Sequence, residues 1–298
     1  MDKAILQELK KQIEDVRIGE KMSKHTSFKV GGPADVMVLP KTQAEIRSAV
    51  KILGAQNMFV MGKGTNLLVT QKGIRGVVMK IAGNYSGTKF EDDCVSVKSG
   101  TSLSSFVNAA GKRSLGGVEF LAGIPGTMGG AIVMNAGAFG GEICEFVQEV
   151  TLATREGIIV LNRDEMNFSY RHSILCDIPM VVVSAKLKLI DCDKEQSKCR
   201  QSELSARRRD KQPLEYASAG STFKRPEGYY AGVLIEQAGC RGLCVGGAQV
   251  SQKHAGFIVN KGKATPDDVL ELIEQVRGKV KAQCGVELET EVKVVGER

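Results

Sequence analysis

Four short segments of the sequence carry polar side chains that ordinary packing does not require. They are Tyr170-Arg171, the run from Ser218 to Pro226, the run from Gly246 to His254, and Glu291 near the end of the chain. Arginine can bind a carboxylate or a phosphate through two hydrogen bonds, and serine, histidine and glutamate can transfer protons. Each segment alone also has a structural interpretation, because Gly-Ser pairs are typical of turns and an alternating glutamate is normally solvated.

Glycine is the most informative residue type, because 34 of the 298 residues are glycine, about 11% against a usual share near 7%. The stretch from Leu121 to Gly141 holds seven glycines in 21 residues, interleaved with Ile, Val, Met and Phe. A disordered linker would lack these apolar residues. We therefore expect an ordered, backbone-lined surface for a flat or phosphorylated ligand, or else a loop-rich corner with several positive φ angles.

A shorter glycine turn, Gly62-Lys63-Gly64-Thr65-Asn66, follows directly on a predicted strand at Met58 to Met61. Its backbone amides would be suited to face phosphate oxygens. The turn matches neither the Gly-x-Gly-x-x-Gly pattern nor a Walker loop, so a tight turn without a ligand explains it equally well.

The elements that must position these residues alternate between helix and strand. An amphipathic helix is predicted at the N-terminus, and Thr42 and Glu45 predict a capping box that opens the next helix. Thr265 and Pro266 predict the start of the last helix. Further strands are predicted at 34–39, 76–81, 94–98, 147–153, 158–161 and 180–190, and further helices at 103–110 and 191–211. The alternation from Val286 to Val294 predicts a half-buried strand with an acidic face.

Length and charge exclude several protein classes. At roughly 150 residues per domain the chain suggests about two domains. No apolar stretch approaches the roughly 20 residues that span a bilayer, and the N-terminus lacks the features of a signal peptide, so we expect a cytoplasmic protein. The net charge is +7 and aromatic residues make up only 5%. The alternative from another class is a nucleic-acid-binding protein. Such a protein should combine clustered positive charge with stacking aromatic residues, and the low aromatic content argues against it.

The eight cysteines are scattered along the chain and none forms a Cys-x-x-Cys pair. We therefore expect reduced thiols. Cys240, Cys244 and His254 come nearest to a metal-binding pattern, but a zinc site needs four ligands at tighter spacing, so no metal is expected.

Several motifs recur together in one order along the chain. They are the glycine-rich stretch, Tyr170-Arg171, Gly220 to Pro226, Gly246 to Phe257, and Leu288 to Val292. From about Thr26 to its end, the sequence closely resembles the UDP-N-acetylenolpyruvoylglucosamine reductase family. The resemblance implies an α+β protein with an FAD-binding fold of the vanillyl-alcohol oxidase type. Its two α+β subdomains would occupy residues 1–84 and 85–200, and a C-terminal α+β substrate-binding domain would occupy residues 201–298.

The resemblance also implies a function. Members of the family are FAD-dependent oxidoreductases of bacterial peptidoglycan synthesis, on which cell shape and division depend. They use NADPH to reduce the enolpyruvyl ether of UDP-N-acetylglucosamine to UDP-N-acetylmuramate. The partners would be the sugar nucleotide and NADPH, without nucleic acid or membrane. A second dinucleotide-binding domain would need about 150 further residues, so the two substrates would alternate at one site in ping-pong kinetics.

By position in the family's motifs, Arg171 and Glu291 would bind the substrate carboxylate and Ser221 would donate a proton, with Lys211 as its helper. FAD contacts would fall on Gly62, Gly64, Thr65, Asn66, Gly123, Pro125, Gly126, Thr127, Gly129, Gly130 and Ala131. Substrate contacts would fall on Tyr170, Lys211, Lys224, Arg225 and Gln249.

Three further features bear on this assignment. The loop from Gly62 to Thr65 departs from the family's usual three glycines and a serine. The short interval from Arg171 to Lys211 resembles the subgroup without an inserted tyrosine loop. We expect the arginines at 207–209 to lie on a solvated helix face. Another flavin enzyme of the same fold would keep the glycine loops and lose the set Arg171, Ser221 and Glu291.

Overall fold

The computed structural model of the protein describes residues 2–298, and the chain divides into two compact units. Unit 1 contains the residues up to 18 together with 36–63 and 76–207, and unit 2 contains 19–35, 64–75 and 208–298. The three-part division at 84/85 and 200/201 stays a prediction. Residues 34–39 and 58–61 were predicted as strands, and both are confirmed as β2 (Pro33–Val38) and β3 (Met58–Met61).

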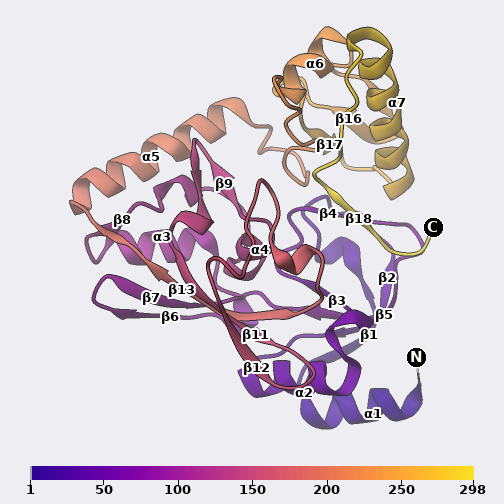
Figure 1. The fold of residues 1–298 in the computed structure, drawn as a ribbon. Coiled ribbons are helices and arrows are strands. Elements are labelled where there is room, and N and C mark those ends of the chain that lie inside the picture. Colours follow the sequence, from indigo (N-terminus) through magenta and orange to yellow (C-terminus); the bar gives the residue numbers. More distant parts are fainter. Residues whose placement is uncertain (1) are drawn as a thin grey trace. The chain divides into compact units, whose positions relative to one another are not determined.

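The first sheet has the strand order β1-β2-β5-β3, with β1 at Val16–Lys21 and β5 at Ile74–Lys80. Strand β3 runs parallel to β5. Helices α1 (Lys3–Gln12) and α2 (Gln43–Leu53) lie together at the lower edge of the view in Figure 1. The predicted capping box at Thr42 is confirmed, because Thr42 Oγ1 accepts the Glu45 N–H at 3.1 Å.

Unit 1 also contains a five-stranded antiparallel sheet of order β12-β11-β13-β7-β6. Its strands are β6 (Thr88–Glu91), β7 (Cys94–Lys98), β11 (Val147–Ala153), β12 (Ile158–Asn162) and β13 (Val181–Lys188). The long strand predicted at 180–190 is interrupted, because Ile190–Asp191 (β14) pairs separately with β8 (Leu115–Gly116). The predicted hairpin of β11 and β12 is confirmed.

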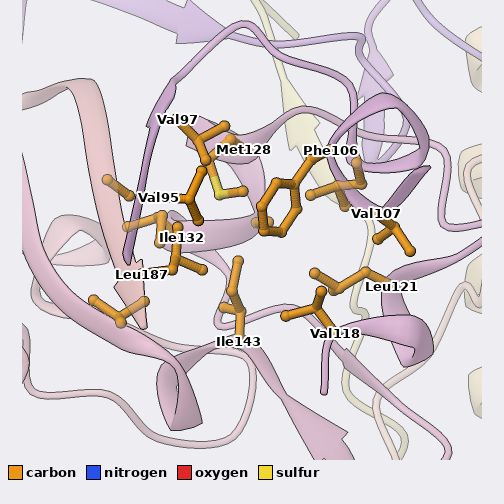
Figure 2. Close-up of a cluster of buried hydrophobic side chains, with 14 of the residues drawn as sticks. Val95, Val97, Phe106, Val107, Val118, Leu121, Met128, Ile132, Ile143 and Leu187 are labelled. Carbon is orange, nitrogen blue, oxygen red and sulfur yellow. The ribbon is translucent and has the colours of Figure 1, made fainter. Parts of the chain in front are cut away.

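A core of apolar side chains lies in unit 1 among strand β7 and helices α3 (Leu103–Gly111) and α4 (Met128–Val133). Figure 2 shows Phe106, Met128 and Ile132 directed into one apolar interior. All three side chains are fully buried. Burying a side chain of this size stabilises the fold by about 1.5–3 kcal/mol, so this core fixes α4 and the residues before it.

Unit 2 is built around α7 (Pro266–Cys284), with α6 (Ala231–Gln237) beside it (Figure 1). The small antiparallel sheet β15-β16-β17 consists of Cys244–Val245, Ala248–Val250 and Ile258–Asn260. The predicted cap at Thr265 is confirmed, and Thr265 also forms a capping box with Asp268. The buried residues of α7 are Pro266 and the five apolar residues that the helical period predicts, Val269, Leu272, Ile273, Val276 and Val280.

The predicted strand from Val286 to Val294 is wrong over most of its length. Only Lys293–Val295 (β18) forms a strand, and it pairs in parallel with β4 (Leu67–Val69). The residues before it are extended and make single bridges, such as Phe223 to Thr290. The alternating pattern therefore indicated a segment with alternating burial, but not one that pairs with a neighbouring strand along its whole length.

Helix α5 (Lys194–Lys211) is confirmed as a long polar helix, drawn as the salmon-coloured rod in Figure 1. Its arginine cluster was expected to be solvated. Arg207 and Arg209 are exposed, but Arg208 is only 8% exposed, and burial lowers the pKa of its guanidinium. Within residues 2–298, no helix is both long and apolar enough to cross a membrane.

Candidate active site

The backbone of Gly62 lies against the side chain of Thr127 in unit 1. A Cβ atom at Gly62 would stand 2.3 Å from Thr127 Oγ1, well inside van der Waals contact. Only a residue without a side chain fits there. The contact joins the end of β3 to the residue that caps α4, since Thr127 accepts the Gly130 N–H at 3.5 Å. The two glycine segments singled out in the sequence therefore meet.

The glycine-rich stretch pairs along its length with the segment that leads into α3. Met128 N–H donates to the Thr101 carbonyl at 2.9 Å, and Gly129 N–H donates to the Ser99 carbonyl at 2.8 Å. A Cβ at Gly129 would lie 3.0 Å from Ser99 Cβ, so glycine permits this close approach as well. The stretch is ordered, but it also contains four positive φ angles, at Gly123, Asn135, Phe139 and Gly140, so the surface for a ligand stays a prediction. The same stretch holds α4 and the hairpin of β9 (Gly137–Ala138) and β10 (Gly141–Glu142), which the composition did not indicate.

A cavity of about 420 Å³ opens beside this surface, within unit 1. It is lined by glycines, by hydroxyl side chains and by one cation, and its lining contains no carboxylate and no large apolar side chain: Lys63, Gly83, Ser86, Gly87, Thr88, Gly100, Thr101, Ser102 and Ser105. Hydroxyls and a lysine are suited to the ribose and phosphate oxygens of a nucleotide. The cavity and the Gly62–Thr127 contact together fit a phosphorylated cofactor.

The predicted cofactor-binding residues fall in both units. Gly62 and the residues from Gly123 to Ala131 belong to unit 1, and Gly64, Thr65 and Asn66 belong to unit 2. Gly123 and Gly64 have φ angles of +75° and +68°, which L side chains rarely adopt. In unit 2, Asn66 Nδ2 donates to the carbonyl of Glu291 at 3.1 Å. The Asn66 side chain therefore anchors a predicted catalytic residue.

Arg171 occupies a tight turn of unit 1 in a strained backbone conformation. Ser169 and His172 exchange two backbone hydrogen bonds of 3.1 Å, and Arg171 between them has a φ angle of +56°. A left-handed conformation costs a residue other than glycine about 1–2 kcal/mol, and such strain is concentrated at functional sites. The Arg171 guanidinium donates to the Gly137 carbonyl at 3.1 Å and lies 4.9 Å from the centre of the Tyr170 ring.

In unit 2, the segment that carries Ser221 lies between two others. Thr222 N–H donates to the Gly256 carbonyl, and the Thr222 carbonyl accepts the N–H of Glu291, both at 2.8 Å. Thr222 itself is fully buried, whereas Ser221 is exposed. This backbone hydrogen bond brings the segment that carries Ser221 beside the segment that carries Glu291.

The three glutamates that the sequence could not distinguish have different surroundings. Glu289 forms an ion pair with Lys224, and Glu287 lies 3.5 Å from Lys281 and 3.7 Å from Arg277. Both are exposed, but Glu291 is half-buried. This difference agrees with the selection of Glu291 by the family motif.

The remaining predicted substrate residues all belong to unit 2 except Tyr170. The Arg225 guanidinium lies 4.1 Å from the centre of the Tyr230 ring, and Gln249 Nε2 donates to the Gly242 carbonyl at 3.3 Å. Lys211 ends α5.

Burial lowers the pKa of His254, and the charges of Arg241 and Lys211 lower it further. His254 Nδ1 accepts the Gly256 N–H at 3.1 Å, so the neutral imidazole carries its proton on Nε2.

Sequence reasoning did not identify the hydroxyl residues of the cavity, Ser86, Thr88, Ser102 and Ser105. The available signal was the run Ser99-Gly100-Thr101-Ser102, in which hydroxyls surround a glycine ahead of a predicted helix. Such a run is also typical of an ordinary helix cap, and Ser102 does cap α3. Only the fold shows that the same residues line a cavity.

Comparisons with known proteins agree with this geometry. The FAD binding domain family matches residues 34–161, and the family described as UDP-N-acetylenolpyruvoylglucosamine reductase, C-terminal domain, matches residues 212–295. The UDP-N-acetylenolpyruvoylglucosamine reductase of Clostridioides difficile is 46% identical, covering 95% of this chain and 94% of its own length. That of Caldanaerobacter subterraneus is 47% identical over the full length of both chains.

Solved structures give the same result. The crystal structure of UDP-N-acetylenolpyruvylglucosamine reductase from Thermus caldophilus superimposes with a TM-score of 0.80 at 34% identity, covering 94% of this chain and 98% of that one. The glucose dehydrogenase Phl p 4.0202 matches with a TM-score of 0.53 at 17% identity, covering 64% of this chain and 45% of its own. The second likeness concerns the fold alone. Together with the FAD binding domain, these matches confirm the expected α+β fold of the vanillyl-alcohol oxidase type.

Replacing Gly62 by alanine tests the surface built on Thr127. The new methyl group would collide with Thr127 Oγ1, so β3 or the start of α4 must shift. We expect Gly62→Ala to weaken FAD binding by about tenfold or more, the consequence of overpacking by about 1–3 kcal/mol. Quenching of flavin fluorescence during titration of the apoprotein measures this change.

Gly157→Ala is the matched control for the glycine substitution. A Cβ at Gly157 meets no atom within 4 Å, and the residue lies in the turn between β11 and β12. This variant should bind FAD as the wild type does. An unchanged affinity in Gly62→Ala would show that the contact with Thr127 does not support the cofactor surface.

Proposed function

Because the chain belongs to the UDP-N-acetylenolpyruvoylglucosamine reductase family, we propose that it reduces the enolpyruvyl ether of UDP-N-acetylglucosamine to UDP-N-acetylmuramate, with NADPH as the reductant. The protein is an FAD-dependent oxidoreductase of peptidoglycan synthesis. One observation carries the proposal for its active site: the Thr222 carbonyl binds the Glu291 N–H and so holds an exposed serine beside a half-buried glutamate.

The residues of unit 1 fit the cofactor. The amides of Gly126 and Thr127, the bare backbone at Gly62 and the hydroxyls of the adjoining cavity would hold the diphosphate and ribose, with Lys63 supplying positive charge. When bound, FAD supplies the two-electron chemistry that carries a hydride from NADPH to the terminal carbon of the enol ether. We propose that the chain holds FAD without a covalent bond.

Addition of a hydride to an enol ether leaves negative charge on the neighbouring carbon and on its carboxylate. Arg171 is suited to hold this carboxylate, because its guanidinium stays charged at all relevant pH values and can bind two oxygens at once. Tyr170 is half-exposed beside it and would contact the same part of the substrate. The strained turn fixes the backbone of Arg171, and the contacts with the Gly137 carbonyl and the Tyr170 ring restrain the guanidinium, so less side-chain freedom remains to be lost on binding.

Glu291 contributes most when it is protonated, because a neutral carboxyl can donate a hydrogen bond to the carboxylate that gains charge. Ser221 would then transfer its hydroxyl proton to the carbanionic carbon. A serine gives up this proton only if the alkoxide is stabilised, and the ammonium group of Lys211 would supply that stabilisation. Lys224, Arg225 and Gln249 would contact the diphosphate and the carboxylate.

NADPH and the sugar nucleotide would occupy one site in turn. The two matched families account for residues 34–161 and 212–295, and neither is a second dinucleotide-binding domain. The proposal therefore includes ping-pong kinetics, in which the oxidised nicotinamide leaves before the enol ether binds.

Ser221→Ala separates the two half-reactions. If Ser221 supplies the proton, its loss should leave the consumption of NADPH unchanged and slow the reaction with the enolpyruvyl sugar nucleotide by about 10³-fold. Stopped-flow absorbance resolves the two steps. Ser218→Ala, in the same segment, is the control and should behave as the wild type. Equal slowing of both half-reactions in Ser221→Ala would mean that the serine supports only the turn.

Substitution of the three glutamates tests the choice of Glu291. Glu291→Gln keeps a hydrogen-bond donor, so it should lose no more than about tenfold in the second half-reaction, whereas Glu291→Ala should lose about 100-fold or more. Glu287→Ala and Glu289→Ala should cost little, because both side chains are exposed and paired with cations. If alanine at Glu287 or Glu289 were as harmful as at Glu291, the assignment would be wrong.

A further inference from the structure

The residue that follows α4 and its cap, Asn135, is fully buried and uses its whole side-chain amide. Its Nδ2 group donates to Glu142 Oε2 at 2.8 Å and to the Ser169 carbonyl at 3.0 Å. Its Oδ1 accepts the Cys144 N–H at 3.2 Å. One side chain thus binds two other segments of unit 1, one at Glu142 to Cys144 and one at Ser169.

Both of these segments hold Arg171. The Ser169 carbonyl that accepts from Asn135 also accepts the His172 N–H at 3.1 Å, the hydrogen bond that closes the turn around Arg171. The Arg171 guanidinium donates to the Gly137 carbonyl, and Gly137 pairs across the β9–β10 hairpin with Glu142, the other acceptor of Asn135. Asn135 therefore fixes both the backbone of Arg171 and the hairpin that its side chain contacts.

The left-handed backbone conformation of Asn135 is explained separately, by the way in which α4 ends. Its φ angle is +41°, its N–H donates to the Ile132 carbonyl at 3.3 Å, and the Ala136 N–H donates to the Ala131 carbonyl at 2.9 Å. This is the Schellman pattern that ends a helix, in which glycine is the usual residue. Ending α4 therefore requires only the backbone conformation. The choice of asparagine adds three buried hydrogen bonds that glycine would not make.

We propose that Asn135 is a positioning residue for Arg171, and hence a determinant of how tightly the protein binds the carboxylate of its substrate and product. This inference rests on the proposed function of Arg171. A turn strained by a φ angle of +56° relaxes unless its surroundings hold it, and the amide of Asn135 is the buried group that holds the Ser169 carbonyl in place. Removing the amide takes away one of the two hydrogen bonds that the Ser169 carbonyl accepts and lets the turn move.

Asn135→Gly removes the amide and keeps the left-handed conformation, so the helix still ends normally. Calorimetric titration of the FAD-loaded protein with UDP-N-acetylmuramate should show affinity lower by about tenfold in this variant. In an Arg171→Ala background the same substitution should change the affinity by less than about twofold, because the free-energy effects of two substitutions that act through one contact do not add.

Ser173→Ala is the control. It removes a 2.8 Å hydrogen bond from the same loop to the Val133 carbonyl, and the affinity should not change.

Equal losses from Asn135→Gly in the wild-type and Arg171→Ala backgrounds would overturn the proposal, because they would indicate a general structural effect. Unchanged affinity in Asn135→Gly would overturn it as well.

Hydrogen exchange at the His172 amide gives a second measurement that does not depend on the role of Arg171. Exchange should be faster in Asn135→Gly and unchanged in Ser173→Ala. If Arg171→Ala bound the product as the wild type does, the proposed function of Arg171 would fail, while faster exchange would still support the positioning role of Asn135.

Discussion

The contact between the bare backbone of Gly62 and the side chain of Thr127 is the constraint on which the proposed cofactor surface depends. It brings the end of a parallel strand against the residue that caps α4, and no side chain fits between them. The glycine-rich stretch is held in turn by backbone hydrogen bonds to Ser99 and Thr101 and by the apolar core below α4. The amides of the surface are therefore fixed before any ligand arrives, which lowers the entropic cost of binding.

The residues proposed to act on the substrate are held by backbone hydrogen bonds as much as by side chains. Arg171 lies in a left-handed turn closed by Ser169 and His172, and Ser221 lies beside Glu291 through the carbonyl of Thr222. Buried polar groups such as Asn135 secure these segments because an unsatisfied group in their place would cost about 1–3 kcal/mol. The backbone strain at Arg171 and the buried Asn135 side chain thus lie together around one of the groups proposed to bind the substrate.

Local signals in the sequence predicted much of the fold. The capping box at Thr42 and the cap at Thr265 form as expected, because their side-chain and backbone partners are only three residues apart. The strand predicted from the alternation between Val286 and Val294 is mostly wrong, because an extended segment can alternate in burial whether or not it forms continuous backbone hydrogen bonds with a neighbouring strand. Arg208 is buried by tertiary packing that charge patterning does not reveal. For the site, composition predicted the glycine surface, whereas the roles of Arg171, Ser221 and Glu291 came from the family resemblance, and no local pattern marked Asn135.

The central claim is that the two glycine segments form one surface for FAD. Hydrogen–deuterium exchange of the backbone amides, measured with and without FAD, tests it most directly. The account predicts that FAD slows exchange in the peptides covering Gly62 to Asn66 and Gly126 to Gly130 together. Slowed exchange confined to other segments, such as Gly246 to His254, with both glycine segments unchanged, would contradict it.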